Sequence, residues 1–85
     1  MKAATFRGER DIRIEEVPDP TVEAPTDAVV RITHTAVCGS DLWFYRGQRD
    51  YDAGDPVGHE PMGIVESVGE DVTSVRPGDR VLAPF

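Results

Sequence analysis

Alternating hydrophobic and polar residues predict a chain made mostly of short β-strands. A two-residue period runs over Lys2–Arg7 and again over Ile12–Val17, with a turn at Gly8–Asp11 between them, which predicts a hairpin. Prolines at positions 18, 20 and 25 then mark a loop, because proline cannot donate a hydrogen bond to a strand ladder. The start of the sequence therefore predicts two paired strands followed by irregular chain.

The longest predicted strand covers Ala28–Val37. Both of its faces are partly apolar, so we expect it to lie centrally in a sheet. Gly39 interrupts the strand, and Ser40 or Asp41 can cap a short helix that continues to Tyr45. A glycine at position 47 is typical of a helix end.

The second half of the sequence predicts a loop and two further strands. The polar, acidic stretch Gln48–Pro56 predicts a surface loop, and Met62–Val68 returns to the two-residue period of a strand. Pro77–Asp79 predicts a tight turn, after which Arg80–Leu82 begins a final strand. Short strands, many turns and one short helix fit a small, mostly antiparallel barrel.

Composition indicates one small globular domain and narrows the class of partner. The chain has 85 residues, of which 39% are hydrophobic. The 9 Lys and Arg residues face 16 Asp and Glu residues, and this net charge of −7 argues against a nucleic acid or an anionic membrane as partner.

The cysteine content and the two ends of the chain indicate its cellular compartment and whether it is a whole protein or a fragment. A single cysteine cannot form an internal disulfide, the N-terminus lacks an apolar signal core, and no apolar stretch approaches membrane-spanning length. We therefore expect a cytoplasmic protein. The chain stops at Phe85 in apolar sequence, so we expect it to be a fragment.

Cys38 and His59 carry the pair of groups that zinc prefers, a soft thiolate and an imidazole. A lone cysteine is most often a small buried apolar residue, but His59 lies in a bend between Gly58 and Glu60 rather than on an apolar face. A catalytic zinc site normally uses three protein ligands and an open position. The third ligand must then come from beyond the chain, with Glu60 as the only local substitute.

Ser40 and Asp41 follow the cysteine closely and each has two interpretations. A ligating histidine usually donates its other N–H to a carboxylate or carbonyl, and Asp41 could accept that bond from His59. The Ser40 hydroxyl could hydrogen-bond an oxygen bound to zinc. Helix capping is the alternative for both residues. The aromatic residues Trp43–Tyr45 are interpreted as helix packing, with Trp43 able to face a cleft.

Three motifs in the same order resemble those of the zinc-dependent medium-chain alcohol dehydrogenases. Residues 38–42 (Cys-Gly-Ser-Asp-Leu) resemble the first zinc-ligand motif, residues 58–65 resemble the Gly-His-Glu-x-x-Gly-x-Val signature, and residues 75–81 resemble the turn that follows. The resemblance implies a mostly β, GroES-like fold, a small and partly open β-barrel with one short helix, truncated here. Residues 1–85 would be the N-terminal part of the catalytic domain, and the Rossmann NAD(P) domain would be absent from this chain.

The resemblance also assigns roles to individual residues. It implies that Cys38 and His59 are catalytic zinc ligands and that the Ser40 hydroxyl hands on the alcohol proton. It makes Asp41 the partner of His59, and Glu60 a carboxylate near the zinc. Many relatives carry a histidine where this chain has Trp43, and a bulky indole there could narrow the substrate cleft.

The function implied by the resemblance belongs to a longer parent protein. The parent would be a zinc-dependent oxidoreductase that transfers hydride between a small alcohol or carbonyl substrate and NAD or NADP, as a homo-oligomer, while the fragment alone would be inactive. The alternatives are a non-catalytic GroES-like module of the chaperonin type and a zinc-free reductase. The acidic stretch Gln48–Pro56 disfavours the first, and the presence of Cys38 and His59 disfavours the second.

Overall fold

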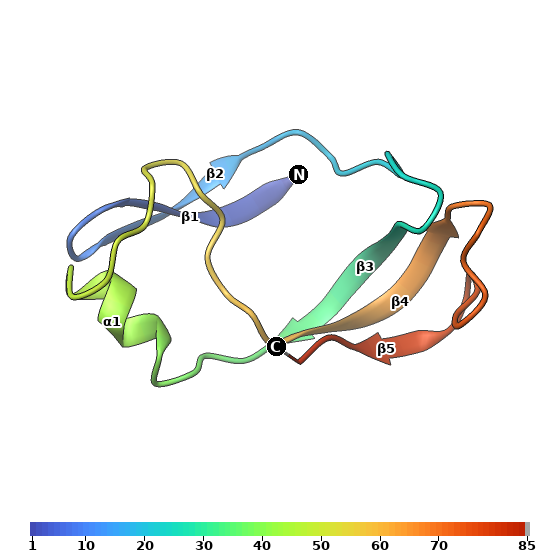
Figure 1. Ribbon diagram of the computed structural model, residues 1–85. Coiled ribbons are helices and arrows are strands. Elements are labelled where there is room, and N and C mark those ends of the chain that lie inside the picture. The colour runs from blue at the N-terminus through green and yellow to red at the C-terminus, as the bar shows by residue number, and fades with distance from the viewer. Residues whose placement is uncertain (85) are drawn as a thin grey trace. The chain divides into compact units, whose positions relative to one another are not determined.

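The computed structural model describes residues 1–84, and β-strands dominate that part of the chain (Figure 1). In chain order the elements are β1 (Lys2–Gly8), β2 (Asp11–Glu16), β3 (Ala28–Thr35), α1 (Asp41–Tyr45), β4 (Pro61–Val68) and β5 (Arg80–Leu82). The strands form a two-stranded sheet, β1-β2, and a three-stranded sheet, β3-β4-β5. The expected mostly β fold with one short helix is confirmed for these residues, and the two sheets are not joined into a closed barrel.

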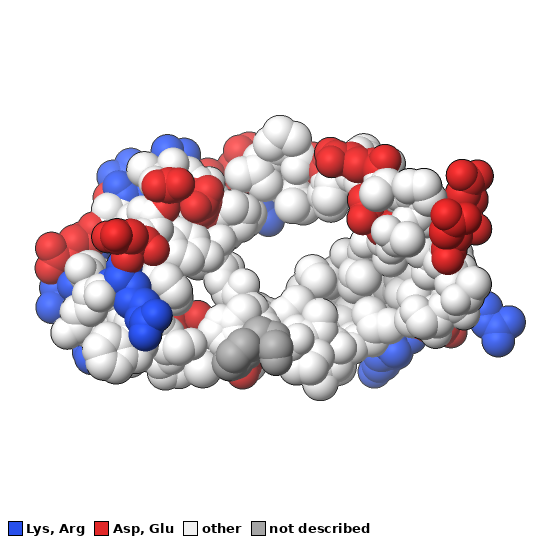
Figure 2. All heavy atoms as spheres, viewed as in Figure 1, with Lys and Arg blue, Asp and Glu red and all other residues white. Residues whose placement is uncertain are grey.

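The contacts divide the chain into two compact units. The first unit holds Met1–Asp19 and Ala36–His59, and therefore contains the hairpin and α1. The second holds Pro20–Thr35 and the chain from Glu60 onward, and contains the three-stranded sheet. Acidic side chains are exposed on both units (Figure 2), in keeping with the net charge of −7. No helix in the described chain is long and apolar enough to cross a membrane.

The first unit is built on the predicted hairpin. β1 and β2 pair antiparallel from Lys2 opposite Glu16 to Gly8 opposite Asp11, as the alternation of the sequence indicates. Phe6 is buried, and its ring meets the ring of Tyr51 edge-on with centroids 5.7 Å apart. Tyr51 in turn meets Phe44 of α1, with centroids 4.7 Å apart. Three aromatic rings from distant segments therefore form the apolar contact that holds the hairpin, the loop and α1 together.

The loop that leads to His59 is tied to the second edge of β1. The N–H of Phe6 donates to the carbonyl of Asp55 at 2.9 Å, and the N–H of Val57 donates to the carbonyl of Ala4 at 2.9 Å. These two backbone bonds fix the chain two residues before His59. The acidic stretch predicted as a surface loop is mostly exposed, yet its last residues gain strand-like pairing from β1.

In the second unit β4 is the central strand. β3 pairs with one edge of β4 from Ala28 opposite Val68 to Thr35 opposite Pro61, and β5 pairs with the other edge. The expectation that the strand at 28–37 lies centrally was wrong, because β3 pairs only with β4 among the described strands. Its apolar Ile32 is 52% exposed, whereas Val65 at the centre of β4 is 2% exposed. Apolar residues on both faces were therefore not a sufficient sign of a central position.

A glycine in β4 sets the distance between β3 and β4. A Cβ built on Gly63 would lie 2.3 Å from the carbonyl oxygen of Arg31 and 2.7 Å from a methyl group of Val30. Because the nearer atom belongs to the backbone of the paired strand, it cannot move aside without breaking the ladder. The predicted tight turn before β5 is also present: Gly78 has a φ of 96°, and the N–H of Asp79 donates to the carbonyl of Arg76 at 3.1 Å.

Candidate metal centre

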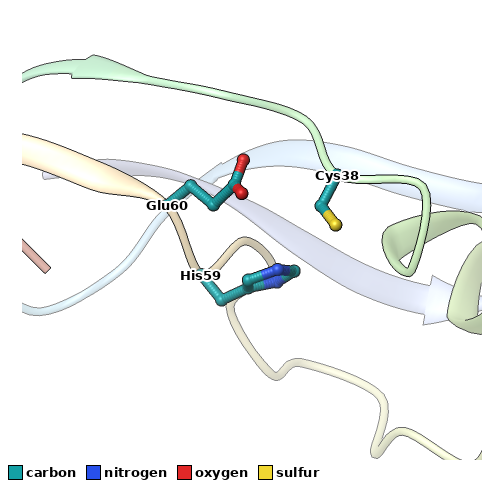
Figure 3. Close-up of side chains that lie close together, drawn as sticks. All are labelled: Cys38, His59 and Glu60. Carbon is teal, nitrogen blue, oxygen red and sulfur yellow. The ribbon is translucent and has the colours of Figure 1, made fainter. Parts of the chain in front are cut away.

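Cys38 and His59, which are 21 positions apart in the sequence, lie side by side in the first unit (Figure 3). Cys38 lies on the connection between β3 and α1, and His59 lies at the end of the segment tied to β1. The Sγ atom of Cys38 and a ring nitrogen of His59 are within 4.8 Å of one another, and both residues are half-buried. A thiol and an imidazole thus face one another at a partly solvent-exposed position.

Local backbone geometry explains how His59 reaches this position. Val57 is held by its bond to Ala4, and Gly58 then adopts a φ of 107°, in the left-handed region that favours glycine. This glycine turns the chain between the anchored Val57 and the imidazole. On the other side, the sharp connection at Gly39 brings Cys38 directly before the first turn of α1.

Asp41 connects the two candidate ligands. Its Oδ1 atom lies 3.1 Å from Nδ1 of His59, and its Oδ2 atom accepts the backbone N–H of Cys38 at 2.9 Å. One carboxylate thus holds the imidazole and the backbone beside the thiol. An ionised carboxylate only accepts hydrogen bonds, so a neutral His59 carries its proton on Nδ1 and presents the lone pair of Nε2.

The capping interpretation of Ser40 and Asp41 differs from what the structure shows. Ser40 occupies the N-cap position of α1, but its side chain makes no capping hydrogen bond. The Asp41 carboxylate is likewise directed to Cys38 and His59 rather than to the N–H groups of the helix. The hydrogen bond that the amide of Cys38 donates to Asp41 was missed in the sequence analysis, because capping and outer-ligand roles use the same residue types at the same spacing.

The Ser40 hydroxyl lies against both candidate ligand atoms. It donates a hydrogen bond to Sγ of Cys38 at 3.3 Å, and its oxygen lies 3.5 Å from Nε2 of His59. A hydroxyl in this position is within hydrogen-bonding reach of any group that is bound between the sulfur and the nitrogen.

Glu60 follows His59 directly in the sequence and begins the second unit, one residue before β4. Its carboxylate is drawn with Cys38 and His59 in Figure 3, and a carboxylate oxygen, a thiol sulfur and an imidazole nitrogen form a donor set suited to a divalent cation. Glu60 is therefore a further candidate oxygen ligand by residue type and by its place next to His59 in the sequence.

The donor atoms fit a zinc ion. Zinc takes sulfur at about 2.3 Å and nitrogen at about 2.0–2.1 Å, so two ligands on one tetrahedral ion lie some 3–4 Å apart. The sulfur of Cys38 and a ring nitrogen of His59 lie within 4.8 Å of one another, and Asp41 supplies the outer hydrogen bond that ligating histidines commonly make. Cys38 and His59 are therefore the two residues that would hold the ion.

Several known proteins that this chain resembles are described as alcohol dehydrogenases. The uncharacterised zinc-type alcohol dehydrogenase-like protein AdhB of Bacillus subtilis is 47% identical over all of this chain and 23% of its own length. The alcohol dehydrogenase of Thermus sp. ATN1 superposes with a TM-score of 0.95 at 40% identity, over all of this chain and 25% of its own. A short chain alcohol dehydrogenase of Escherichia coli CFT073, solved with the cofactor NADH, is 35% identical with a TM-score of 0.81, over 96% of this chain and 23% of its own.

These relatives are longer than the chain, which spans about a quarter of the length of each. The model of the alcohol dehydrogenase GroES-like domain matches residues 24–85, well over half of the chain. It covers both motifs that carry the candidate ligands, and β3, α1, β4 and β5 fall within it. The chain therefore belongs to the alcohol dehydrogenase GroES-like domain family.

Proposed function

We propose that this chain is the N-terminal part of the catalytic domain of a longer zinc-dependent oxidoreductase, which transfers hydride between an alcohol and NAD or NADP. The observation that carries the proposal is the Asp41 carboxylate, which contacts the imidazole of His59 and the amide of Cys38 at once. A carboxylate that orients both residues is typical of a metal site, in which ligating side chains are held by outer hydrogen bonds, and is not required where a thiol and an imidazole are merely neighbours. The relatives, which are zinc-type alcohol dehydrogenases, support the same reading.

In this proposal Cys38 and His59 are two ligands of a catalytic zinc ion, and a third ligand comes from the longer protein. Glu60, beside His59, is a carboxylate near the metal that can serve as an additional ligand or exchange with substrate. When bound, zinc supplies Lewis-acid chemistry, since it polarises an alcohol or carbonyl oxygen and lowers the pKa of an alcohol. The ligand set leaves a position open for substrate.

Ser40 is the residue that handles the proton. Its hydroxyl lies 3.3 Å from the sulfur and 3.5 Å from Nε2 of the two candidate ligands, so a substrate hydroxyl bound between them would meet it. The Ser40 hydroxyl would relay the proton: it would take the alcohol proton as it gives its own to solvent when the alcohol is oxidised, and the exchange would run in reverse when a carbonyl is reduced. Asp41 keeps the proton of neutral His59 on Nδ1, which leaves Nε2 for the metal.

The cofactor and the remaining properties belong to the longer protein. A Rossmann domain beyond this chain would bind NAD or NADP and supply the hydride chemistry. We propose a small-molecule alcohol or carbonyl substrate, no nucleic-acid or membrane partner, a homo-oligomer and a cytoplasmic location. The net charge of −7 disfavours a nucleic-acid or membrane partner, and the single cysteine favours a cytoplasmic location. By itself the 85-residue chain is proposed to be inactive, and nothing favours the alternative of a chaperonin-type module.

Metal analysis of the longer protein and of two variants tests the proposal. Wild type should bind zinc at the catalytic site and oxidise alcohols with NAD or NADP, whereas Cys38→Ala and His59→Ala should lose that zinc and at least a thousandfold in turnover. Circular dichroism serves as the folding control for each variant. Full zinc occupancy and activity in either variant would overturn the ligand assignment.

A further inference from the structure

We propose that the outer edge of β2 is an interface with a second copy of this protein, in which the two β2 strands pair antiparallel about a two-fold axis at Ile14. The observation behind it is an open strand edge whose sequence is complementary to itself. The inference goes beyond the proposed function and assigns a contact surface to the homo-oligomer. It does not depend on the metal, because β2 carries none of the candidate ligands.

β2 has one paired edge and one open edge. β1 takes the paired edge, and no other strand within residues 1–84 lies beside β2. The far edge of β1 is occupied by the backbone of residues 54–57, so β2 ends the sheet on its own side. The row of backbone N–H and C=O groups along such an edge is a template for pairing with another strand.

The hydrogen bonds at the end of the hairpin show which backbone groups of β2 point outward. Met1 and Val17 exchange two bonds between N and O atoms, each 2.8 Å long. Bonded pairs recur at every second residue of an antiparallel ladder, so Glu15 and Arg13 also direct their backbone groups to β1. The residues that direct their N–H and C=O groups away from β1 are therefore Ile12, Ile14 and Glu16.

Pairing about Ile14 is the register in which β2 complements itself. Arg13 of each copy then lies opposite Glu15 of the other, and both side chains stand on one face of the joined sheet. Ile14 lies opposite Ile14 of the second copy, and because its side chain is 69% exposed, pairing would bury apolar surface there. A centre at Arg13 would instead set Arg13 against Arg13 and Asp11 against Glu15, and like charges repel.

The charges of Arg13 and Glu15 are only partly used within the chain. Arg13 is 63% exposed and directs Nε and Nη2 to Asp11, which leaves Nη1 for a further acceptor. Oε2 of Glu15 accepts one bond, from Arg7 at 2.9 Å, and a carboxylate oxygen can accept two. Each residue can therefore add a partner across the interface, and the two symmetric pairs specify the register.

The other outer strands of the chain are less suited to this kind of pairing. The ladder of β3 shifts register twice, between Val29 and Val30 and between Ile32 and His34, whereas β2 keeps one register with β1 from Glu16 to Ile12. β5 has only three residues. Charged side chains often keep edge strands from pairing, but charges of opposite sign on one face do not repel the same strand when it runs in reverse.

A cysteine on the proposed axis tests the contact directly in the longer protein. Hydrogen-bonded pairs have Cα atoms about 5.5 Å apart, within the range that a disulfide spans, so Ile14→Cys should form a covalent dimer with oxidised glutathione. Ile12→Cys is the matched control on the same edge. Two copies of residue 12 would lie about 13 Å apart along the strands and should not cross-link. Gels run without and with dithiothreitol measure the dimer.

A change of charge gives a second test that needs no new cysteine. Arg13→Glu sets two carboxylates against each other at both symmetric positions, so the dissociation constant of the contact should rise about tenfold or more. Arg49→Glu makes the same change of charge in the exposed loop and should leave the constant unchanged. Light scattering over a dilution series measures the constant, and circular dichroism is the folding control. Equal constants for Arg13→Glu and wild type would contradict the pairing.

The remaining outcomes show what else occupies the edge. If Ile14→Cys stays uncross-linked and reacts rapidly with a thiol reagent, the edge is open to solvent. If it stays uncross-linked and reacts slowly, another part of the longer protein covers the edge. Either result overturns the proposal.

Zinc content and alcohol oxidation of the wild type are measured on the same samples. Zinc and activity without the cross-linked dimer would sink the interface alone. A dimer in a protein without zinc or activity would sink only the proposed function.

Discussion

One carboxylate oxygen of Asp41 lies 3.1 Å from Nδ1 of His59, and the other accepts the amide of Cys38 at 2.9 Å. Cys38 and His59 come from segments that are far apart in the sequence. The contacts of Asp41 with both residues hold these two segments in a fixed relative position. The carboxylate is itself fixed by the first turn of α1, in which Asp41 is the first residue. The helix thus positions the carboxylate, and the carboxylate contacts both residues that bear candidate ligands.

Replacing this carboxylate should weaken metal binding without unfolding the protein. Asp41→Asn keeps the size of the side chain but removes the charge that holds His59, so we expect zinc affinity to fall by about 10- to 100-fold. Competition with a chromophoric chelator measures the affinity. Asp50→Asn, in the exposed loop, is the matched control and should leave it unchanged. An unaltered affinity in Asp41→Asn would mean that the contact with His59 is structural only.

The Ser40 hydroxyl should matter for turnover and not for the metal. Ser40→Ala removes a group that contacts both candidate ligand atoms but is not itself a donor that zinc requires, so zinc content should be normal. The loss of proton transfer should lower kcat by roughly 100-fold or more, and Ser40→Thr should restore most of it because it returns the hydroxyl. Zinc content by atomic absorption and kcat are measured together. Parallel loss of both in Ser40→Ala would contradict the assigned role.

Much of this architecture could be predicted from the sequence, because its signals are local. The hairpin follows from alternation and the turn before β5 from Pro77–Asp79, and both are present. The central position given to residues 28–37 was wrong, since strand order depends on which strands pair, and a single strand's pattern does not contain that information. Pairing partners are a tertiary property.

The candidate site shows the same division. The chemistry of Cys38 and His59 could be predicted from residue type, and their closeness could be expected only through the resemblance to a family. The bond from Asp41 to the amide of Cys38, and the missing side-chain cap at Ser40, could not be predicted, because capping and outer-ligand roles use the same residue types at the same spacing. Only the position of His59 decides between the two roles.

Gly63 should tolerate no side chain. A Cβ at this position would lie 2.3 Å from the carbonyl oxygen of Arg31, so Gly63→Ala must push β3 away from β4. We expect a loss of about 3 kcal/mol in the free energy of unfolding. Gly39→Ala is the matched control, because a Cβ there meets no atom within 4 Å and its φ is not positive. Urea denaturation of both variants measures the difference, and equal midpoints would show that the two strands can separate without cost.

The ion pair across the hairpin should make stability depend on pH in a defined direction. Glu15 accepts a hydrogen bond from the guanidinium of Arg7, with 2.9 Å between Nη2 of Arg7 and Oε2 of Glu15. It also accepts one from the buried hydroxyl of Thr5. The Arg7 hydrogen bond, followed by that of Thr5, holds the pKa of Glu15 below its ordinary value of 4.5. A carboxylate whose pKa is lowered by folding stabilises the folded state above its unfolded pKa, and this contribution disappears as the pH falls through the folded pKa.

Glu15→Gln should therefore lower Tm at pH 7, and the difference from wild type should shrink as the pH is taken below 4.5. The Glu15 side chain is 29% exposed, so solvent screens the pair and high salt should reduce the effect at pH 7. Glu70→Gln, at an exposed position in the turn after β4, is the matched control and should shift Tm little at any pH. Thermal scans at pH 3.5, 5 and 7 make the comparison. A difference between Glu15→Gln and wild type that stays constant from pH 7 to pH 3.5 would show that charge on Glu15 does not stabilise the hairpin.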